Sequence, residues 1–339
     1  MKIYFPTILL FTSFALGGGD FDKVGTTTAQ FLKLGVGARA MGMGGSFVAL
    51  SDDGSAMYWN PAGMVNQKDL ATTFNHHNWA LDISHDFVGV SFSTGRSGVL
   101  GLSLTTLSMD EQDVTTVNEP DGNGQTYSVM DMAFGISYAH QISDRFSYGQ
   151  TVKFIRLMAY NEIANTVAID IGMLLQTDFH GLKIGMCLSN FGGEPQYEGR
   201  DLIDKADIDE DIAGNNLSDV TLTTEPWPLP LLFRIGIAAD LLGKNDAFIS
   251  SNRNRLTMSL DAEHPNDSRE HLNLGCEYSF NELFFLRGGY RFNYDEEYMT
   301  FGTGLKINLG IFGKTFLNYS VRSFGPFGNT TQISMDLEL

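Results

Sequence analysis

The sequence predicts an all-β protein, a 14-stranded antiparallel transmembrane β-barrel formed by residues 69–339. Three observations predict this fold class. From about residue 69 onward, large apolar side chains alternate with small or polar ones, which is the period of a strand with one apolar face. Charged residues make up only 18% of the chain, whereas about 25% is usual in soluble domains. Glycine is abundant, with 37 residues, and aromatic residues reach 12%, a composition that favours sheet with tight bends.

The segment 130–138 shows the alternation clearly. Its even positions are Met, Met, Phe, Ile and Tyr, whereas its odd positions are Asp131, Ala133, Gly135 and Ser137. A soluble β-sandwich, the alternative fold, would turn its apolar face inward and carry many charged residues outside. The polar face of this chain is instead largely glycine, serine, threonine and alanine with isolated charges. This pattern favours a crowded, wet lumen with an apolar exterior over a sandwich.

Residues 1–17 have the features of a secretory signal peptide. Lys2 precedes an apolar stretch, which ends in the small-residue site Ala15-Leu16-Gly17. A buried N-terminal strand is the alternative, which Pro6 disfavours. No later uncharged stretch is long enough to cross a membrane as a helix. We therefore predict export through the signal peptide and residence in the cell outer membrane.

Residues 25–66 do not alternate, and they make up most of a glycine-rich segment, residues 18–68, ahead of the barrel. Within it, Gly35-x-Gly37-x-x-Ala40 formally matches a dinucleotide-binding fingerprint. The context that this fingerprint needs is missing, because glycines at 42, 44 and 45 disfavour a helix there and no βαβ unit follows. We expect the glycines instead to let this backbone lie tightly against a barrel wall.

One short helix is expected within this segment. The cluster Ser51-Asp52-Asp53 is typical of a helix N-cap, which predicts a helix through residues 55–57. Asn60-Pro61 should end the helix, because a residue that precedes proline avoids helical angles. Residues 60–63 should then form a turn that leads the chain into the first strand.

The alternation from residue 69 to the end divides into fourteen strands, an even number, as closure of a barrel from a single bacterial chain normally requires. If both termini are periplasmic, the even-numbered connections should be short, and five of the six are. The long loops, 110–126 and 192–228, both fall at the opposite, extracellular end. The expected strands are 69–79, 86–94, 98–109, 127–140, 145–159, 165–178, 181–191, 229–240, 255–264, 270–279, 283–293, 298–307, 314–322 and 330–339.

The chain is strongly acidic, with 40 acidic residues, 22 basic residues and a formal net charge of −18. Such a chain repels phosphate backbones, so we expect no nucleic-acid partner. Segments 110–121, 194–225 and 295–297 hold 18 of the acidic residues and only two basic ones, all at the predicted extracellular end. The carboxylates at 207–211 could suit calcium, but they lack the glycine and the spaced glutamate of a dedicated site, which favours a solvated loop.

The sequence shows no nucleophile elbow, zinc-ligand spacing or phosphate-binding loop. We therefore predict that the protein is not an enzyme and name no catalytic residue, cofactor or metal ligand. His76 and His77 point to opposite faces of their strand and are interpreted, with His85, as polar residues of a barrel rim. Cys187 and Cys276 have opposite strand parity, so we expect them on opposite sides of the wall and free.

Two stretches of the N-terminal segment resemble a known family. Residues 37–49 (Gly-Ala-Arg-Ala-Met-Gly-Met-Gly-Gly-Ser-Phe-Val-Ala) and 58–64 (Tyr-Trp-Asn-Pro-Ala-Gly-Met) look like the N-terminal signature of PorV/PorQ proteins. These are outer-membrane proteins related to the FadL superfamily of hydrophobic-compound transporters. Segments 274–278, 286–291 and 302–305 resemble the same proteins, whereas Asn318 stands where they usually show aspartate. The resemblance implies that residues 18–68 form a hatch with a short helix inside the barrel lumen.

Two sets of residues are candidates for function. The resemblance implies a structural or gating role for the hatch motif, which comprises Arg39, Gly42, Gly44, Gly45, Asn60, Pro61 and Gly63. Residues whose parity turns them into the lumen are candidate contacts for a transported molecule: Asp131, Lys153, Asp170, Arg234, Asp261 and Glu277. The alternative is that these charges pair with each other or with the hatch, because an isolated buried charge is costly.

Three functions remain open. The resemblance implies first a barrel that takes part in type IX-like protein secretion and in surface attachment of cargo. The second is FadL-like uptake of hydrophobic small molecules, and the third is a structural, porin-like barrel. The expected partners are outer-membrane lipid and either secreted cargo proteins, other secretion-system components or a hydrophobic ligand.

Overall fold

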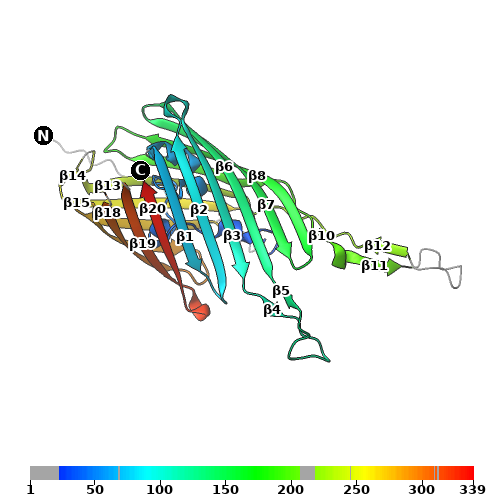
Figure 1. The fold of residues 1–339 in the computed structure, drawn as a ribbon. Coiled ribbons are helices and arrows are strands. Elements are labelled where there is room, and N and C mark those ends of the chain that lie inside the picture. The colour runs from blue at the N-terminus through cyan, green and yellow to red at the C-terminus, as the bar shows by residue number, and fades with distance from the viewer. Residues whose placement is uncertain (1–22, 68, 207–217, 245, 309, 311–312) are drawn as a thin grey trace, which may run out of the picture.

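The computed structural model describes residues 23–67, 69–206, 218–244, 246–308, 310 and 313–339. The predicted signal peptide, residues 1–17, and the acidic run 207–211 lie outside them. Fourteen antiparallel strands follow one another around a closed ring, because each pairs with its neighbours along the chain and the last pairs with the first (Figure 1). The predicted barrel is therefore confirmed, and no strand end differs from its expected position by more than three residues.

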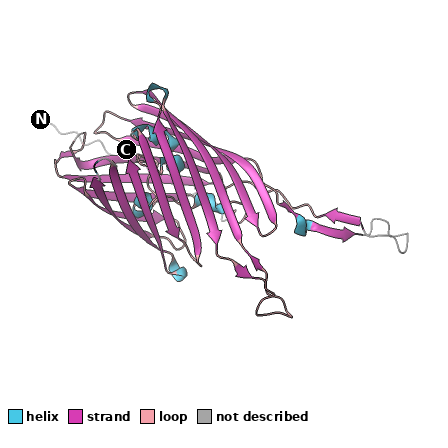
Figure 2. Cartoon of the chain, in the orientation of Figure 1, coloured by secondary structure: helices cyan, strands magenta, loops and turns pink. Residues whose placement is uncertain are grey.

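The strands of the ring are β1 (Leu70–Asn78), β2 (Ile83–Ser93), β3 (Val99–Met109), β6 (Val129–Ser143), β7 (Phe146–Ala159), β8 (Glu162–Gln176), β9 (Lys183–Gly192), β13 (Leu232–Gly243), β15 (Asn254–Pro265), β16 (His271–Phe280), β17 (Phe284–Phe292), β18 (Met299–Asn308), β19 (Lys314–Ser323) and β20 (Asn329–Glu338). Figure 2 shows how strongly strands dominate the molecule. Short helices η3 (Gly95–Ser97) and η6 (Gly325–Phe327) lie in two of the turns. Closure leaves no strand edge of the ring unpaired, which lets strands cross an apolar layer.

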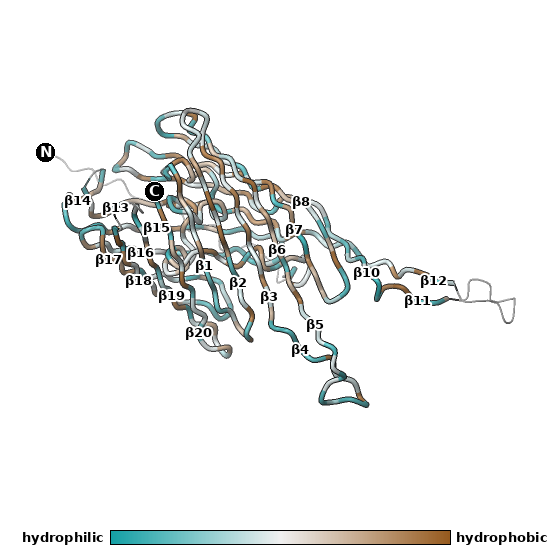
Figure 3. The backbone as a smooth tube through the Cα atoms, in the orientation of Figure 1, coloured by the Kyte–Doolittle hydropathy of each residue, from teal (hydrophilic) through white to brown (hydrophobic). Residues whose placement is uncertain are grey.

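The alternation seen in the sequence becomes an apolar outside and a polar inside. On β6, Phe134 and Ile136 are exposed on the outer face, whereas Ala133 and Ser137 are buried inside. Figure 3 shows the same apolar and polar alternation along neighbouring strands. Cys187 is buried inside the wall, Cys276 lies on the outward-facing parity of β16, and both are free. Among the described residues, no helix is long and apolar enough to cross a membrane.

Both long loops leave the barrel at the same end, as predicted (Figure 1). We call this the long-loop end, and the opposite end, which holds the turns 144–145 and 281–283, the short-turn end. The loop after β3 forms a hairpin of β4 (Gln112–Asp113) and β5 (Thr126–Tyr127). The loop after β9 carries β10 (Glu198–Gly199), η4 (Arg200–Leu202) and the hairpin of β11 (Ile203–Ala206) with β12 (Ser218–Thr221). At the short-turn end, β14 (Ile249–Ser250) pairs with β13.

Residues 29–67, called here the lumenal segment, pack inside the ring. This segment contains η1 (Gln30–Lys33), α1 (Ala38–Gly42), α2 (Ala56–Trp59) and η2 (Pro61–Asn66). It lies within the ring of strands in Figure 1, where α1 contacts β17 to β20 and η2 contacts β6 to β8 on the other side. Val36, Phe47 and Met64 are fully buried there. The segment has a small core of its own around Phe47 and Trp59, and its remaining apolar side chains pack in two clusters shared with the wall.

The predicted short helix is present as α2 and ends at Asn60, whose backbone is extended. Two local expectations need correction. Ser55 is the residue at the N-cap, and Asp53 supports it by accepting hydrogen bonds from the Ser55 N–H (3.0 Å) and hydroxyl (2.6 Å). Residues 60–63 do not form a simple turn, because Asn60 accepts from the Ala62 N–H and caps η2, with Pro61 at its first position.

Candidate functional site

The charged centre of the lumen joins the lumenal segment to the wall at Arg39. Its Nη1 lies 2.6 Å from Asp52 and 3.3 Å from Asp53 within the same segment. Its Nε lies 3.0 Å from a carboxylate oxygen of Glu277 on β16. Because Arg39 bridges carboxylates of both parts, it fixes the position of α1 against the wall.

Glu277 is almost fully buried, yet it is compensated by three guanidinium groups. Besides Arg39, it accepts from Arg255 at 2.9 Å and from Arg287 at 2.7 Å. Arg287 also donates to the side-chain oxygen of Asn318 at 2.9 Å, and the Asn318 amide in turn donates to Asp336 at 3.1 Å. Asn318, where related proteins are expected to have aspartate, therefore avoids a contact between two carboxylates. The network extends from β15 to β20 on the inner wall.

The two aspartates beside Arg39 differ in their protonation behaviour. Burial acts to raise the pKa of Asp52, but Arg39 and Lys183 outweigh it, so this pKa falls below its usual value. Burial raises the pKa of Asp53 above its usual value, since Arg39 opposes this only in part and the charge of Asp52 adds to it. Asp52 is therefore the persistent anion beside Arg39, whereas Asp53 is the one more readily neutralised on acidification.

Asp261 and Arg234 hold the middle of the lumenal segment. Asp261 on β15 is fully buried and accepts hydrogen bonds from the backbone N–H groups of Phe47 (2.7 Å) and Val48 (2.8 Å). Arg234 on β13 lies 3.1 Å from Glu263, and its guanidinium sits 5.0 Å from the centre of the Trp59 ring. Both candidate lumen residues therefore contact the lumenal segment itself.

Lys153 and Asp170 form a separate pair on β7 and β8, with 2.8 Å between Nζ and Oδ2. Asp170 also accepts from the backbone N–H of Asn190 at 2.8 Å. The register of β8 and β9 shifts at this point, between Ile169 and Ile171. Asp131 lies on the inward-facing side of β6. Among the described residues, it forms no ion pair or hydrogen bond with the other five candidates.

The remaining residues of the hatch motif act through close approach to other backbone. The Asn60 side chain donates to the carbonyl oxygens of Val48 (2.9 Å) and of Met173 on β8 (3.0 Å). A Cβ on Gly63 would lie 1.8 Å from the Ser51 oxygen, so no other residue fits without displacing the chain. Gly44 has φ of +71° and would carry a Cβ 3.2 Å from the Leu274 oxygen. Gly42, Gly45 and Pro61 complete the motif, all against the wall or the rings of the segment.

The wall also has inward-facing glycines that lie against the backbone of the lumenal segment. The sequence analysis did not identify them. On Gly149, Gly185 and Gly289, a Cβ would lie between 2.2 and 2.4 Å from backbone atoms of the lumenal segment. These glycines could have been identified from the sequence, because the alternation along each strand places them on the face that points into the lumen. The sequence analysis also missed Arg255 and Arg287, which share the inward parity of Asp261 and Gly289.

A chamber of about 320 Å³ remains at the long-loop end, above the lumenal segment. Trp59 and Met41 of the segment contribute to its lining, together with inward residues of the wall and residues 294–297 between β17 and β18. Arg291 and Arg322 of the lining share the single carboxylate of Glu297. This volume falls in the range of small-molecule sites, and the lining combines charged side chains with apolar surface from residues such as Trp59, Met41 and Phe324.

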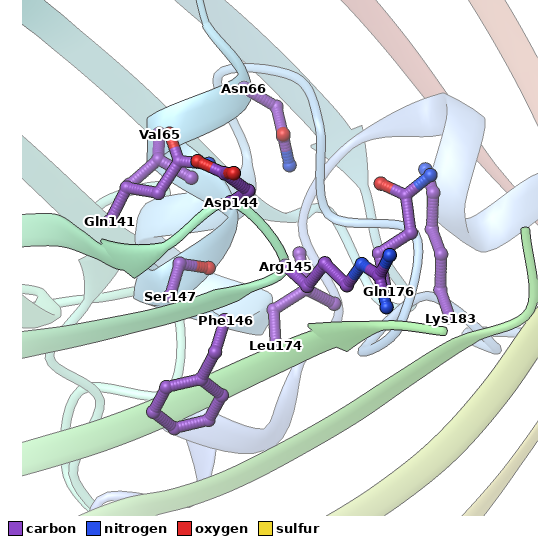
Figure 4. A pocket seen from close by; sticks show the side chains of 10 residues that line it. All are labelled: Val65, Asn66, Gln141, Asp144, Arg145, Phe146, Ser147, Leu174, Gln176 and Lys183. Carbon is purple, nitrogen blue, oxygen red and sulfur yellow. The ribbon is translucent and has the colours of Figure 1, made fainter. Parts of the chain in front are cut away.

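A much smaller cavity, of about 40 Å³, lies at the short-turn end (Figure 4). Figure 4 shows Gln141 and Asp144 on one side of it and Arg145, Gln176 and Lys183 on the other. It has room for a few water molecules and not for a substrate.

The histidines are not equivalent rim residues. His76 faces outward and lies 2.6 Å from Asp86, whereas His77 and His85 are buried opposite each other inside the wall, with ring centres 6.2 Å apart. His77 and His85 thus differ from His76 in being buried inside the lumen, which the interpretation as rim residues did not anticipate. In the part of the chain that the structure describes, no group of three or more His, Cys, Asp or Glu could hold a metal ion.

Comparisons with known proteins extend this description. The family model "Type IX secretion system protein PorV" matches residues 19–198, which is more than half of the chain. No curated protein sequence matches it.

Solved structures share the fold. The toluene transporter TodX of Pseudomonas putida superposes with a TM-score of 0.57 at 12% identity, covering 89% of this chain and 97% of TodX. The toluene transporter TbuX of Ralstonia pickettii gives 0.54 at 14% identity, with 89% and 97% covered. The CymD monoaromatic hydrocarbon channel gives 0.53 at 12% identity, with 89% and 96% covered. At these identities the likeness concerns the barrel fold alone.

Proposed function

Because the chain belongs to the PorV family of type IX secretion system proteins, we propose that it receives exported proteins at the outer membrane and passes them to a surface-attachment step. The family match over residues 19–198 carries this proposal. Under it, the signal peptide delivers the chain to the outer membrane, the barrel anchors it there, and the long-loop end faces the cell exterior. Its partners are cargo proteins or other components of the secretion system.

The lumenal segment serves in this proposal as a hatch that keeps the barrel closed. Its contacts reach most of the ring, from β6 to β8 on one side and from β13 to β20 on the other. Charged groups on both sides, centred on Arg39 and Glu277, hold it in place. A closed barrel acts in secretion as a docking platform, and folded cargo does not pass through its lumen.

The loop after β9 is the part best suited to meet a partner. Its two limbs are joined by hydrogen bonds, from Thr224 to the Tyr197 carbonyl at 2.8 Å and from the Trp227 N–H to the Pro195 carbonyl at 3.3 Å. These bonds make it a two-stranded stalk that projects well beyond the barrel (Figure 1). Ile203 and Leu222 are exposed along it. Apolar side chains on a projecting acidic stalk are consistent with a contact surface for another protein.

Replacing residues 194–225 with a short Gly-Ser linker tests the proposal. Barrel assembly, followed by heat-modifiable migration in gels, should be unchanged, while cargo at the cell surface should fall. The matched control replaces residues 114–124, at the tip of the other long loop, with a linker of the same kind. If the amount of surface cargo is unchanged in the 194–225 variant, the stalk does not have the proposed role. If it is unchanged in a strain that lacks the whole protein, the secretion function itself is contradicted.

A second candidate is uptake of hydrophobic small molecules, which the shared fold with toluene transporters favours. The charged side chains that line the chamber above the lumenal segment oppose it, because an apolar ligand would shield them from water without forming hydrogen bonds to them. Liposomes containing the purified protein decide between the candidates. Entry of toluene faster than into empty liposomes would support uptake, whereas equal rates would leave the secretion proposal alone. A conductance like that of an open pore would instead favour a porin-like barrel.

A further inference from the structure

We propose that Arg156 and Asn165, on the outer face of the wall near the long-loop end, bind the phosphate of a membrane lipid whose acyl chains lie against the apolar wall beside them. The inference does not depend on the secretion role, although it uses the outer-membrane location and the orientation proposed above. In that orientation the lipid belongs to the outer leaflet, and the partner is a phosphorylated glycolipid of the lipid A class.

Arg156 on β7 faces away from the lumen. Its neighbours Ile155 and Leu157 are buried inside, in a cluster with residues of the lumenal segment, whereas Phe154, which shares the parity of Arg156, is exposed on the outer face. Every other lysine or arginine on the described strands of the ring has the inward parity of its strand. An outward arginine on a barrel wall is unfavourable toward the middle of the membrane, so this exception calls for a partner.

The protein itself supplies no such partner within the part of the chain that the structure describes. The Arg156 guanidinium forms no ion pair or hydrogen bond there, and its Nε is buried without a partner. The two adjacent strands, β6 and β8, carry no carboxylate on their outer faces. Glu198 of β10 lies opposite Ile163 and does not pair with Arg156. The donors of Arg156 are therefore available to an acceptor from outside the chain.

Asn165 adds a second donor beside Arg156. The two residues are directly opposite each other in the register of β7 and β8, and Asn165 is exposed on the same outer face. Opposite side chains on one face have Cβ atoms about 4.5–5.5 Å apart, so the guanidinium and the amide can contact the same phosphate. A planar guanidinium binds two phosphate oxygens at once, and the amide N–H can donate to a third. This pair of side chains favours an anion over a neutral headgroup.

The position on the wall fits the headgroup of a lipid. Arg156 lies three residues before the long-loop end of β7. The next outward residue toward the short-turn end is Phe154, which lies opposite Phe134 on β6 and Val167 on β8, and all three are exposed. They form part of the apolar outer surface that acyl chains cover in a membrane barrel. Donors next to such a surface match an anionic amphiphile better than a soluble phosphate.

The test is native mass spectrometry of the full-length protein in detergent with added diphosphoryl lipid A. We expect the unchanged protein to retain the lipid, and Arg156→Gln to lower the bound fraction at least fivefold. Asn165→Leu, which is similar in size but has no donor, should lower it at least twofold. The matched control is Arg145→Gln, which removes a cation paired with Asp178 at the short-turn end and should leave the bound fraction unchanged. Heat-modifiable migration of each variant checks that the barrel is assembled.

Several outcomes would overturn the proposal. These are no retention of lipid A by the unchanged protein, retention by Arg156→Gln equal to that of the unchanged protein, or an equal loss in Arg145→Gln. Equal retention of dephosphorylated lipid A would show that the phosphate is not recognised, and displacement by an equimolar amount of inorganic phosphate would show that the lipid is not. A protein that co-purifies with the unchanged chain and is lost from Arg156→Gln, while lipid A binding stays the same, would assign this surface to a protein contact instead.

Discussion

At the scale of single residues, the lumen is organised around carboxylates that the wall and the lumenal segment share. Glu277 reaches three guanidinium groups and Asp261 binds two backbone N–H groups. Each acid would be strongly unfavourable alone inside the barrel. Asp261 accepts its two backbone hydrogen bonds from the lumenal segment, and Glu277 takes one of its three guanidinium partners from there. The lumenal segment and the barrel therefore depend on one another.

Arg39→Gln tests this dependence. It removes one cation from Glu277 and the principal partner of Asp52, and breaking a buried ion pair typically costs about 3–5 kcal/mol. We expect a loss of that size in the free energy of unfolding, measured by urea titration of the refolded protein in detergent. Arg145→Gln is the control, because Arg145 pairs with Asp178 at the surface and such pairs contribute about 0–1 kcal/mol. Equal effects of the two substitutions would contradict the network.

The contact between η1 and the connection after β15 should depend on pH. Burial acts to raise the pKa of Asp267, but hydrogen bonds from Lys33, Thr27 and Gln30 outweigh it and hold this pKa below its usual value. A lowered pKa means that the stabilisation is complete above about pH 3.9, the unfolded value, and is lost as the pH falls through the folded value.

Hydrogen exchange of residues 26–34, corrected for intrinsic rates, should therefore show equal protection at pH 7 and pH 5 and a loss below about pH 3.9. Asp267→Asn should lower protection at every pH, because the ion pair with Lys33 is then absent. The surface variant Asp178→Asn serves as the control. Protection that declines already between pH 7 and pH 5 would show that another group governs the contact.

At the scale of elements, β17 places two adjacent glycines on opposite sides of the wall. A Cβ on Gly289 would lie 2.2 Å from the Gly44 nitrogen, whereas a Cβ on Gly288 would meet nothing within 4 Å. Gly289→Ala should therefore push α1 and the turn after it away from the wall, while Gly288→Ala should be tolerated. Since both changes are the same in chemistry, their difference isolates the contact with the lumenal segment.

We expect Gly289→Ala to assemble as a barrel but to lower the protection of residues 38–46 in hydrogen exchange and to lower the unfolding midpoint. Gly288→Ala should match the unchanged protein in both measurements. If the two variants behave alike, the close approach between Gly44 and β17 does not hold the segment in place.

Some of these features could be predicted from the sequence and others could not, because some depend on local alternation and others on contacts between distant segments. The strands were predictable because the pleat turns every second side chain to the same face, so each residue of 130–138 carries the signal independently. The partners of Glu277 were not predictable, because they depend on the register between strands and on the path of residues 29–67 across the lumen. For the same reason the burial of His77 against His85 on the inner face, near the ends of their strands, was not predictable.

At the scale of the whole molecule, the fold combines a closed wall, an N-terminal segment packed inside it, and two acidic loops at one end. The wall could be predicted by counting strands, and the common end of the loops by the parity of the connections. The chamber above Trp59 could not, because it is the space left between the lumenal segment and residues 294–297. The proposed function as a docking platform predicts that the lumen is closed.

Ion conductance in a planar lipid bilayer tests that closure most directly. The intact protein should conduct little, because residues 29–67 occupy the lumen, and a variant that lacks residues 25–60 should still assemble as a barrel and show a large, steady conductance. The heat-modifiable migration of both proteins provides the check on assembly. An intact protein that conducts as much as the truncated one would contradict the account, since the lumenal segment would then not close the barrel.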